Sequence, residues 1–334
     1  MSRRPARFLL VALHACLVLV ATPAAHASFL DEDGVRAFID DVAARQGFNA
    51  AELRGLFERV QRRDDALEAI ARPAESLPWK RYRPIFLTEA RIDQGIEFLR
   101  GHRDLLSRAT AEYGVPAEIV TAILGVETFY GRHRGDYPVL DTLATLAFEY
   151  PPRADFFRGE LEQFLLLTRN ERIDPRRVTG SYAGAMGMPQ FISSSYRRYA
   201  IDFDGDGQRD LWDSTADVVG SVAAYLARHG WRAGAPVAQR VRPDGIDYRG
   251  LATRGIEPSV TRAELERAGI RLEPPLDDGE RVTLVELEGR DGPEVWAGRR
   301  NFYVITRYNH SPLYAMAVYQ LAERIRSGAA ASTS

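Results

Sequence analysis

The sequence of 334 residues predicts a mainly α-helical fold of the α+β class, with one small antiparallel sheet late in the chain. Two observations predict it. Three segments place a capping side chain three residues before a carboxylate, ahead of apolar residues at helical spacing: Asn49–Glu52, Ser214–Asp217 and Thr261–Glu264. Between Val237 and Ile305, short runs of β-branched and aromatic residues replace this pattern.

Each element follows from its own local signal. Apolar periodicity predicts long helices over 88–112, 116–129, 155–168 and 311–326, while Gly230 and Gly269 are expected to end two others. The predicted strands are Arg281–Glu288, Glu294–Trp296 and Phe302–Ile305. The predicted organisation is an N-terminal helical part (28–112), a core (113–231), a small β subdomain (232–305), a helix completing the core (306–327) and a disordered tail (328–334).

Composition and charge exclude several classes of protein. With 45% hydrophobic and 27% charged residues, the chain is neither collagen-like, nor disordered, nor a polytopic membrane protein. Its 44 Lys and Arg residues nearly balance 46 Asp and Glu residues, and the net charge is −2. Because nothing in this balance gives a basic field for a phosphate backbone, we expect no nucleic-acid partner.

The first 27 residues resemble a cleaved export signal. Three arginines precede an apolar run from Phe8 to Ala21, and Ala25–Ala27 has the small residues that signal peptidase requires. The run is too short to span a bilayer, so the predicted location is the periplasm. The alternative is processing at Cys16 as an outer-membrane lipoprotein, and membrane attachment is expected only if Cys16 is lipidated.

An acidic segment, Asp202–Asp213, matches the calcium-binding loop of the EF-hand. Its expected ligands are Asp202, Asp204, Asp206, the backbone carbonyl of Gln208, and Asp213. The last ligand position holds Asp rather than Glu, so this ligand reaches from a shorter stem. The alternative is an acidic surface turn, in which the carboxylates repel one another without a cation. We expect calcium in a structural role.

One carboxylate follows an unusually apolar helix. Pro116 suits the first turn, and Ile119 to Val126 is apolar on every side, so this helix is expected in the core. Glu127 closes it, with Phe129 and Tyr130 as neighbours. Desolvation raises the pKa of a carboxyl group, which suits a general acid. The alternative is a helix-terminal Glu that reaches water.

The segment Gly180–Phe191 is rich in glycine and alanine, which allows a ligand to approach the backbone closely. Ser181 and Gln190 within it are able to hydrogen-bond hydroxyl groups or an acetamide. Such a surface suits a polysaccharide. The alternative is tight helix packing.

Five motifs together resemble a known family. They are Gly125–Thr128, the run 144–151, Gly184–Phe191, the acidic segment and Arg307–Ser311. In this order they resemble the lytic murein transglycosylase B family, glycoside hydrolase family 103, from about Trp79 to about Leu321. The resemblance implies a lysozyme-like, mostly α core with an EF-hand-like calcium loop, a helical flanking part and a small β subdomain. It also implies peptidoglycan as the substrate.

The resemblance further implies roles for single residues. Glu127 matches the catalytic acid and base, and the five loop residues named above match calcium ligands. The family's polar residues that hold the acetamide of muramic acid and its neighbours correspond to Ser181, Gln190 and Asn309. The family's groove tyrosines correspond to Tyr82, Tyr225, Tyr308 and Tyr314. Its basic residue that faces a peptide or lactyl carboxylate corresponds to Arg153. Pro152 and Phe156 depart from the family pattern, so fewer peptide contacts are expected.

The mechanism is predicted from the absence of a second suitable carboxylate in the sequence. Ordinary glycoside hydrolysis uses two carboxylates, but neither Asp136 nor Asp141 has an apolar, ligand-facing context. With Glu127 alone, the N-acetyl group of the substrate is expected to attack C1 and a 1,6-anhydro ring to form, without a metal in the chemistry. The alternatives are a hydrolytic muramidase and a non-catalytic peptidoglycan-binding module. Expected partners are glycan strands and proteins of cell-wall synthesis or remodelling.

Overall fold

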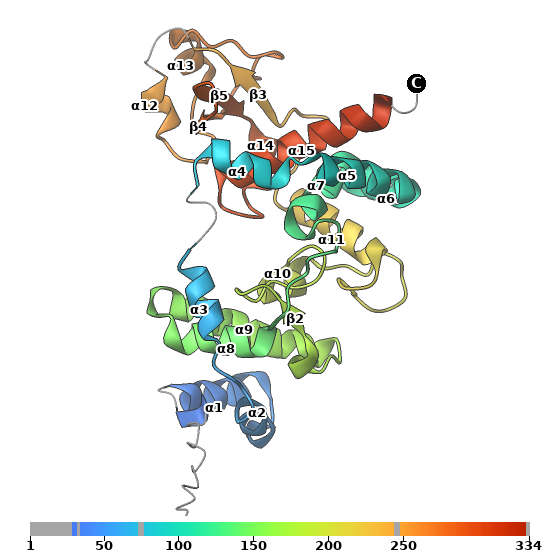
Figure 1. Cartoon of the computed structure of the whole chain (residues 1–334), viewed down its shortest axis with the longest axis vertical. Coiled ribbons are helices and arrows are strands. Elements are labelled where there is room, and N and C mark those ends of the chain that lie inside the picture. Colours follow the sequence, from blue (N-terminus) through green and yellow to red (C-terminus); the bar gives the residue numbers. More distant parts are fainter. Residues whose placement is uncertain (1–28, 32–33, 73–76, 244–247, 332–334) are drawn as a thin grey trace, which may run out of the picture.

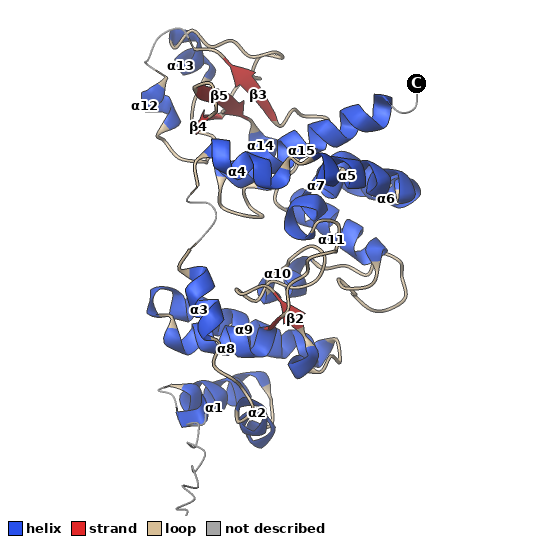
Figure 2. Cartoon of the chain, viewed as in Figure 1, coloured by secondary structure: helices blue, strands red, loops and turns tan. Residues whose placement is uncertain are grey.

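The computed structural model describes residues 29–31, 34–72, 77–243 and 248–331, and it is mainly helical with small antiparallel sheets (Figures 1 and 2). This confirms the predicted fold class. The predicted export signal lies outside the described residues. Within the described part of the chain, no helix has both the length and the apolar character needed to cross a bilayer.

The helices form two groups, stacked along the long axis of the molecule (Figure 1). In the first group α8 packs along α9, and α3 lies against α8. Its members are α1 (Val35–Gln46), α2 (Ala50–Phe57), α3 (Asp64–Ile70), α8 (Val139–Glu149) and α9 (Ala154–Asn170). Residues 28–112 therefore contribute helices to both groups, because α4 (Trp79–Phe86), α5 (Glu89–Gly101) and α6 (Arg103–Tyr113) belong to the second.

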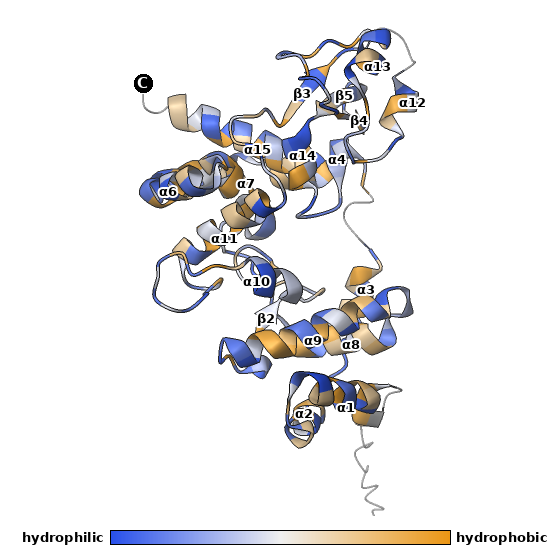
Figure 3. Ribbon diagram, turned by 180° about the vertical axis from the view of Figure 1, so that it is seen from behind, coloured by the Kyte–Doolittle hydropathy of each residue, from blue (hydrophilic) through white to orange (hydrophobic). Residues whose placement is uncertain are grey.

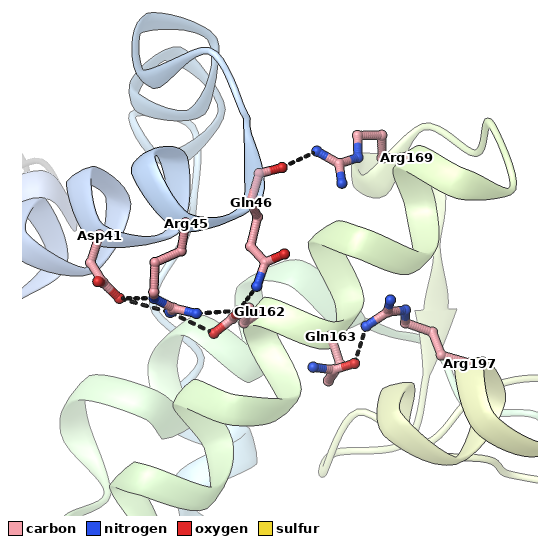
Figure 4. Close-up of polar contacts among 7 residues, drawn as sticks. All are labelled: Asp41, Arg45, Gln46, Glu162, Gln163, Arg169 and Arg197. Carbon is pink, nitrogen blue, oxygen red and sulfur yellow. Dashed lines mark hydrogen bonds and ion pairs between the residues drawn. The ribbon is translucent and has the colours of Figure 1, made fainter.

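Polar contacts fix α1 on α9 (Figure 4). The guanidinium of Arg45 bridges Asp41 and Glu162, with 2.9 Å between Arg45 Nη1 and Glu162 Oε1. The amide of Gln46 donates to the same Glu162 oxygen at 2.7 Å. Because Glu162 is largely shielded from solvent, this attachment is better formed than an ordinary surface ion pair.

In the second group α7 is the central helix and contacts α5, α6, α11 and α15. The members are α4 (Trp79–Phe86), α5 (Glu89–Gly101), α6 (Arg103–Tyr113), α7 (Ala117–Thr128), α11 (Thr215–Arg228), α14 (Arg300–Ile305) and α15 (Pro312–Ala331). Every residue from Ile119 to Val126 is buried, as predicted. Helix α10 (Ser193–Tyr199) contacts both α9 and α11 and so joins the two groups.

The hydropathy of the helices differs with their place in the fold (Figure 3). Helices α8 and α9 carry hydrophobic residues along much of their length, whereas α10 is mostly hydrophilic.

The capping side chains of Asn49, Ser214 and Thr261 each accept a backbone N–H of the helix that follows, as predicted. These local signals therefore located helix starts correctly.

A three-stranded antiparallel sheet stands at the end of the molecule beyond α4 (Figure 2). Its strands, in spatial order, are β3 (Ala238–Val241), β5 (Pro293–Gly298) and β4 (Thr283–Glu288). Helices α12 (Arg249–Ala252) and α13 (Arg262–Arg267) accompany a separate small hydrophobic core here. The strands predicted at 281–288 and 294–296 are confirmed.

Three sequence predictions were wrong in detail. Phe302–Ile305, predicted as a strand, lies in helix α14, because tertiary burial of Phe302 in the main core overrides β propensity. The helix predicted over 88–112 is interrupted at His102 and forms α5 and α6. Helix α15 continues to Ala331 past the predicted start of the tail, since alanine is the best helix former.

A minimal sheet connects two loops that matter below. Strand β1 (Tyr137–Pro138) pairs with β2 (Thr179–Gly180), so the chain that leaves α7 lies beside the start of the Gly180–Phe191 loop. Gly135 makes this crossing possible: its φ is +87°, and a Cβ there would stand 2.1 Å from the Gly180 carbonyl oxygen.

Candidate active site

Glu127 is the next-to-last residue of α7 and is half-buried. Its Oε1 accepts a hydrogen bond of 2.5 Å from the hydroxyl of Tyr314, which lies in the first turn of α15 and is 2% exposed. The carboxyl group is thus held at the contact between two core helices. A short, buried O–H···O bond of this kind fixes one rotamer of Glu127.

The backbone after Glu127 turns sharply. Phe129 and Tyr130 have φ values of 51° and 59°, a left-handed conformation that is costly for bulky residues. Two contacts maintain it: the Thr128 hydroxyl donates to the Met188 carbonyl at 2.8 Å, and Arg91 Nε donates to the Gly125 carbonyl at 2.9 Å. Strained backbone held by tertiary contacts is typical of functional sites.

Four predicted tyrosines surround this position, and we call Tyr82, Tyr225, Tyr308 and Tyr314 the tyrosine cluster. Tyr308 and Tyr314 are stacked, with ring centroids 6.3 Å apart, and Tyr225 packs edge-on against Tyr308 at 4.9 Å. The Tyr225 hydroxyl donates to the Arg307 carbonyl at 2.5 Å. Tyr82 is buried and acts electrostatically on Tyr314. The structure thus brings all four together with Glu127.

Burial keeps these phenols neutral. Desolvation raises the pKa of Tyr225, Tyr308 and Tyr314 above the ordinary value, and the charge of Glu127 raises each of them further. A neutral phenol keeps its hydrogen and is able to donate it in a hydrogen bond. The cluster therefore presents O–H groups to Glu127 and to any ligand beside it.

Among the described residues, Glu127 is the one carboxylate that acts on these three tyrosines. Asp141 faces elsewhere: it accepts a hydrogen bond from the backbone of Gln61 and lies near Arg63, although burial raises its pKa. Asp136 is exposed. The arrangement therefore offers one acid-base group rather than a pair.

The Gly180–Phe191 loop is hydrogen-bonded to this site through Pro189, whose carbonyl accepts the Tyr308 hydroxyl at 2.6 Å. The Ser181 hydroxyl oxygen accepts two backbone N–H groups of its own loop, the nearer at 3.0 Å, so its hydrogen remains to donate. Gln190 donates its amide N–H groups to the Arg134 and Gly187 carbonyls, each at 3.0 Å. Its amide oxygen accepts from no described residue.

Two further predicted contacts are Asn309 and Arg153. Asn309 follows Tyr308 directly in the chain. Arg153 lies at the start of α9, in the other helix group, with its guanidinium 4.2 Å from the ring centre of Phe156 and 5.4 Å from that of Phe157. In the described parts of the chain, no bond or ring contact joins Arg153 to the tyrosine cluster.

The acidic loop and the first turn of α11 form a second carboxylate site. Oxygens of Asp202, Asp204 and Asp217 lie within 4.8 Å of one another. Asp217 is fully buried and accepts backbone N–H groups from Phe203 at 2.6 Å and Asp210 at 2.7 Å. Burial raises the pKa of the Asp217 carboxyl, and the charge of Asp204 adds to this. Clustered carboxylate oxygens are the donors that a hard cation such as calcium takes, so these residues fit the ion.

The structure does not bring every predicted ligand into this group. Asp213 has its side chain 86% exposed and lies 3.5 Å from Arg134, and Asp206 is exposed as well. Asp217 was not predicted as a ligand, because the sequence marks it as the carboxylate of a helix-capping pair with Ser214. A carboxylate so soon after a calcium-loop motif was the available signal.

Residues 31–323 match the model of one protein family, the transglycosylase SLT domain. The chain belongs to this family. Over 307 residues this transglycosylase is 41% identical to the membrane-bound lytic murein transglycosylase B of Escherichia coli, covering 89% of this chain and 84% of that protein.

Solved structures agree with this assignment. The soluble lytic transglycosylase SltB1 of Pseudomonas aeruginosa is 50% identical, with a TM-score of 0.83, over 88% of this chain and 98% of that one. An Escherichia coli lytic transglycosylase solved in complex with calcium is 41% identical, with a TM-score of 0.83, over 90% of this chain and 95% of that one. The resemblance stated from the sequence is confirmed.

Proposed function

We propose that this protein is a lytic transglycosylase that cleaves the β-1,4 bond between N-acetylmuramic acid and N-acetylglucosamine in peptidoglycan and leaves a 1,6-anhydromuramoyl end. Family membership and the murein-cleaving relative support the reaction class and the substrate. The geometry that supports the non-hydrolytic course is a single carboxylate, Glu127, among neutral tyrosines.

Glu127 acts first as an acid and then as a base. It protonates the glycosidic oxygen as the bond from C1 breaks, while the carbonyl oxygen of the substrate's own N-acetyl group bonds to C1. The Glu127 carboxylate then removes the proton from the C6 hydroxyl, and O6 displaces the acetamide oxygen at C1. Every proton is accounted for by one side chain, so neither a second carboxylate nor water is required.

The other site residues bind the sugar. The free hydrogen of Ser181 and the free amide oxygen of Gln190 are complementary to the carbonyl and the N–H of an acetamide, and Asn309 adds a polar contact beside them. The tyrosine cluster offers aromatic faces and O–H donors to the sugar ring. Arg153 is proposed to face a peptide or lactyl carboxylate from the other helix group.

Calcium is proposed as a structural ion, held by Asp202, Asp204 and Asp217 with the acidic loop around them. When bound, it neutralises carboxylates that otherwise repel one another. The Met188 N–H donates to the Leu211 carbonyl at 2.9 Å, so the acidic loop supports the Gly180–Phe191 loop directly. The ion thus stabilises the wall on which Ser181 and Gln190 stand.

Location follows from the substrate. We propose that the protein is exported to the periplasm, where peptidoglycan lies, and that residues 1–27 direct this export. The Escherichia coli relative is described as membrane-bound. Lipidation at Cys16 would attach this protein to a membrane as well.

Product analysis tests the proposal. Purified peptidoglycan is incubated with the enzyme, and the released fragments are analysed by mass spectrometry. Anhydromuramoyl fragments are expected, each lighter than the hydrolysed form by one water molecule. Hydrolysed ends would instead identify a muramidase, and binding of peptidoglycan without any fragment would identify a non-catalytic module. Either result would refute the mechanism assigned to Glu127.

A further inference from the structure

A pocket of about 470 Å³ lies beside Thr179, which leads into the Gly180–Phe191 loop that carries Ser181 and Gln190. The turn after α9 forms one side, with Ile173, Arg177 and Val178, and the second half of the acidic loop forms the other, with Trp212. The pocket is separate from the tyrosine cluster. We call it the Arg177 pocket.

Most charges around the Arg177 pocket are already paired. Arg209 is bonded to Glu171, and Arg134 lies 3.5 Å from Asp213. The third lining carboxylate, Asp210, accepts the backbone N–H groups of Trp212 and Asp213. Arg177 differs from these, because its guanidinium forms no hydrogen bond with any described residue. It acts on Asp174 only through space, and that carboxylate is already bonded to Arg176. One cation of the pocket is therefore available to an anion.

Trp212 supplies a second free donor. Its ring packs against Tyr196, with centroids 5.6 Å apart, so the indole is fixed in place. The indole N–H donates to no residue that the structure describes, although Trp212 lines the pocket. Ile173 and the buried Val178 add apolar surface beside it. An anionic group on an apolar or peptide-like body matches these features.

The position of the pocket relates it to the proposed substrate. Thr179, on its rim, is two residues before Ser181 in the chain. Arg134, also on its rim, accepts the Gln190 amide at its carbonyl oxygen. The two proposed acetamide contacts and the pocket thus share one wall. If Ser181 and Gln190 hold the acetamide as proposed, a group attached to the same muramic acid would lie near this wall.

We propose that the Arg177 pocket binds a carboxylate of the peptide carried by peptidoglycan strands, with Arg177 and the Trp212 indole as donors. The inference rests on the proposed function, because that function supplies the substrate that carries the peptide. A guanidinium and an indole N–H on one carboxylate give two charge-assisted hydrogen bonds. The pocket then distinguishes peptide-bearing strands from bare ones.

Binding measurements on the full chain, at saturating calcium, test the pocket. The probe is the disaccharide N-acetylglucosamine–anhydro-N-acetylmuramic acid with an attached pentapeptide, and its affinity is measured by calorimetry. Arg177→Gln is expected to weaken it about 10-fold, because a charged hydrogen bond at a partly exposed site is lost. The same disaccharide without peptide is expected to bind both proteins equally.

Two controls make the result specific. Arg176→Gln changes the adjacent arginine, which is bonded to Asp174 and does not line the pocket, so it is expected to bind like the wild type. Converting the peptide carboxylates of the probe to amides is expected to reproduce the loss in the wild-type protein. Trp212→Phe keeps the ring, removes the N–H and is expected to weaken only the peptide-bearing probe.

Equal affinities of Arg177→Gln and wild type for the peptide-bearing probe would overturn the proposal, as would an equal loss for the probe without peptide. These outcomes are distinguishable from failure of the proposed function, which is measured separately as the absence of anhydromuramoyl products from the wild-type enzyme. A protein that forms those products but binds both probes alike in all variants retains its function and lacks this site.

Discussion

Two carboxylate sites in this protein differ in what surrounds them. Glu127 is a lone acid, half-buried, with a phenol hydroxyl 2.5 Å away and tyrosine rings around it. Where the acidic loop meets the start of α11, by contrast, Asp202, Asp204 and Asp217 stand within 4.8 Å of one another. At the first site the carboxyl group is paired with a phenol of the protein, whereas the second site gathers negative charges, an arrangement that favours a cation.

The difference shows how the same functional group takes two roles. A single acid among neutral donors is able to exchange its proton with a substrate. Several acids that share one ion are held as carboxylates and brace the chain. The Gly180–Phe191 loop lies between these sites, bonded to Tyr308 on one side and to Leu211 on the other. Under the proposed function, the acidic loop supports the Gly180–Phe191 loop and takes no part in the chemistry.

The largest effect is expected from Glu127→Gln. The amide has the same shape but no transferable proton, so the rate of anhydromuramoyl release falls at least about 1,000-fold, while the melting temperature stays close to that of the wild type. Product mass spectrometry and calorimetry measure the two quantities. Glu118→Gln, in the first turn of the same helix, is the control and is expected to retain activity. Peptidoglycan cleavage that persists in Glu127→Gln would show that Glu127 is not the required acid.

Removal of calcium should act on stability first. If the ion occupies the acidic loop, chelation lowers the melting temperature by roughly 5 to 10 °C, since an ion at many times its dissociation constant contributes several kcal/mol. Asp204→Asn should remove most of this response. Asp278→Asn, in an exposed turn of the β subdomain, should leave it intact. A melting temperature indifferent to calcium would make the loop an ordinary acidic turn.

Gly187→Ala tests the support between the two sites. A Cβ at this position would stand 2.5 Å from the Leu211 carbonyl oxygen, and φ is +69°. We expect the free energy of unfolding to fall by about 2 kcal/mol, and the rate of anhydromuramoyl release to fall as well. Gly234→Ala is a matched control, because φ is +71° there but no atom lies within 4 Å of the added Cβ. Equal losses in both variants would show that the close approach to Leu211 contributes nothing.

The smallest effect is expected from Tyr314→Phe, which removes the O–H donor and keeps the ring. We expect kcat to fall about 10-fold with little change in KM, because one hydrogen bond to a charged group positions Glu127. Tyr303→Phe, in α14, is the control. If kcat is unchanged, the rotamer of Glu127 is held by packing rather than by this bond.

Much of the fold was predictable because its signals are local. Capping residues such as Asn49 and Ser214 need only the backbone beside them, and the apolar run before Glu127 predicts burial wherever the helix packs. Phe302–Ile305 was mispredicted for the opposite reason. Its β-branched and aromatic residues favour a strand, but burial of Phe302 in the main core decides for a helix.

The candidate site likewise has features that the sequence predicts and features that depend on tertiary packing. Glu127, the loop glycines and the first acidic residues were found from motifs and spacing. The approach of Asp217 to Asp202 and Asp204, and the free donors of Arg177 and Trp212, depend on which segments fold against one another. No spacing rule gives such contacts, because the residues are brought together by packing of separate helices and loops.

By itself, the amino-acid sequence determined the helical class, the family resemblance, the lone glutamate and the acidic loop, because each depends on residues close together in the chain. Only the tertiary structure decided that Tyr314 hydrogen-bonds Glu127 across 187 positions of sequence, and that Asp217 approaches Asp202 and Asp204. The physical reason is that burial and hydrogen bonding between distant segments are properties of the packed core, to which all the helices contribute at once.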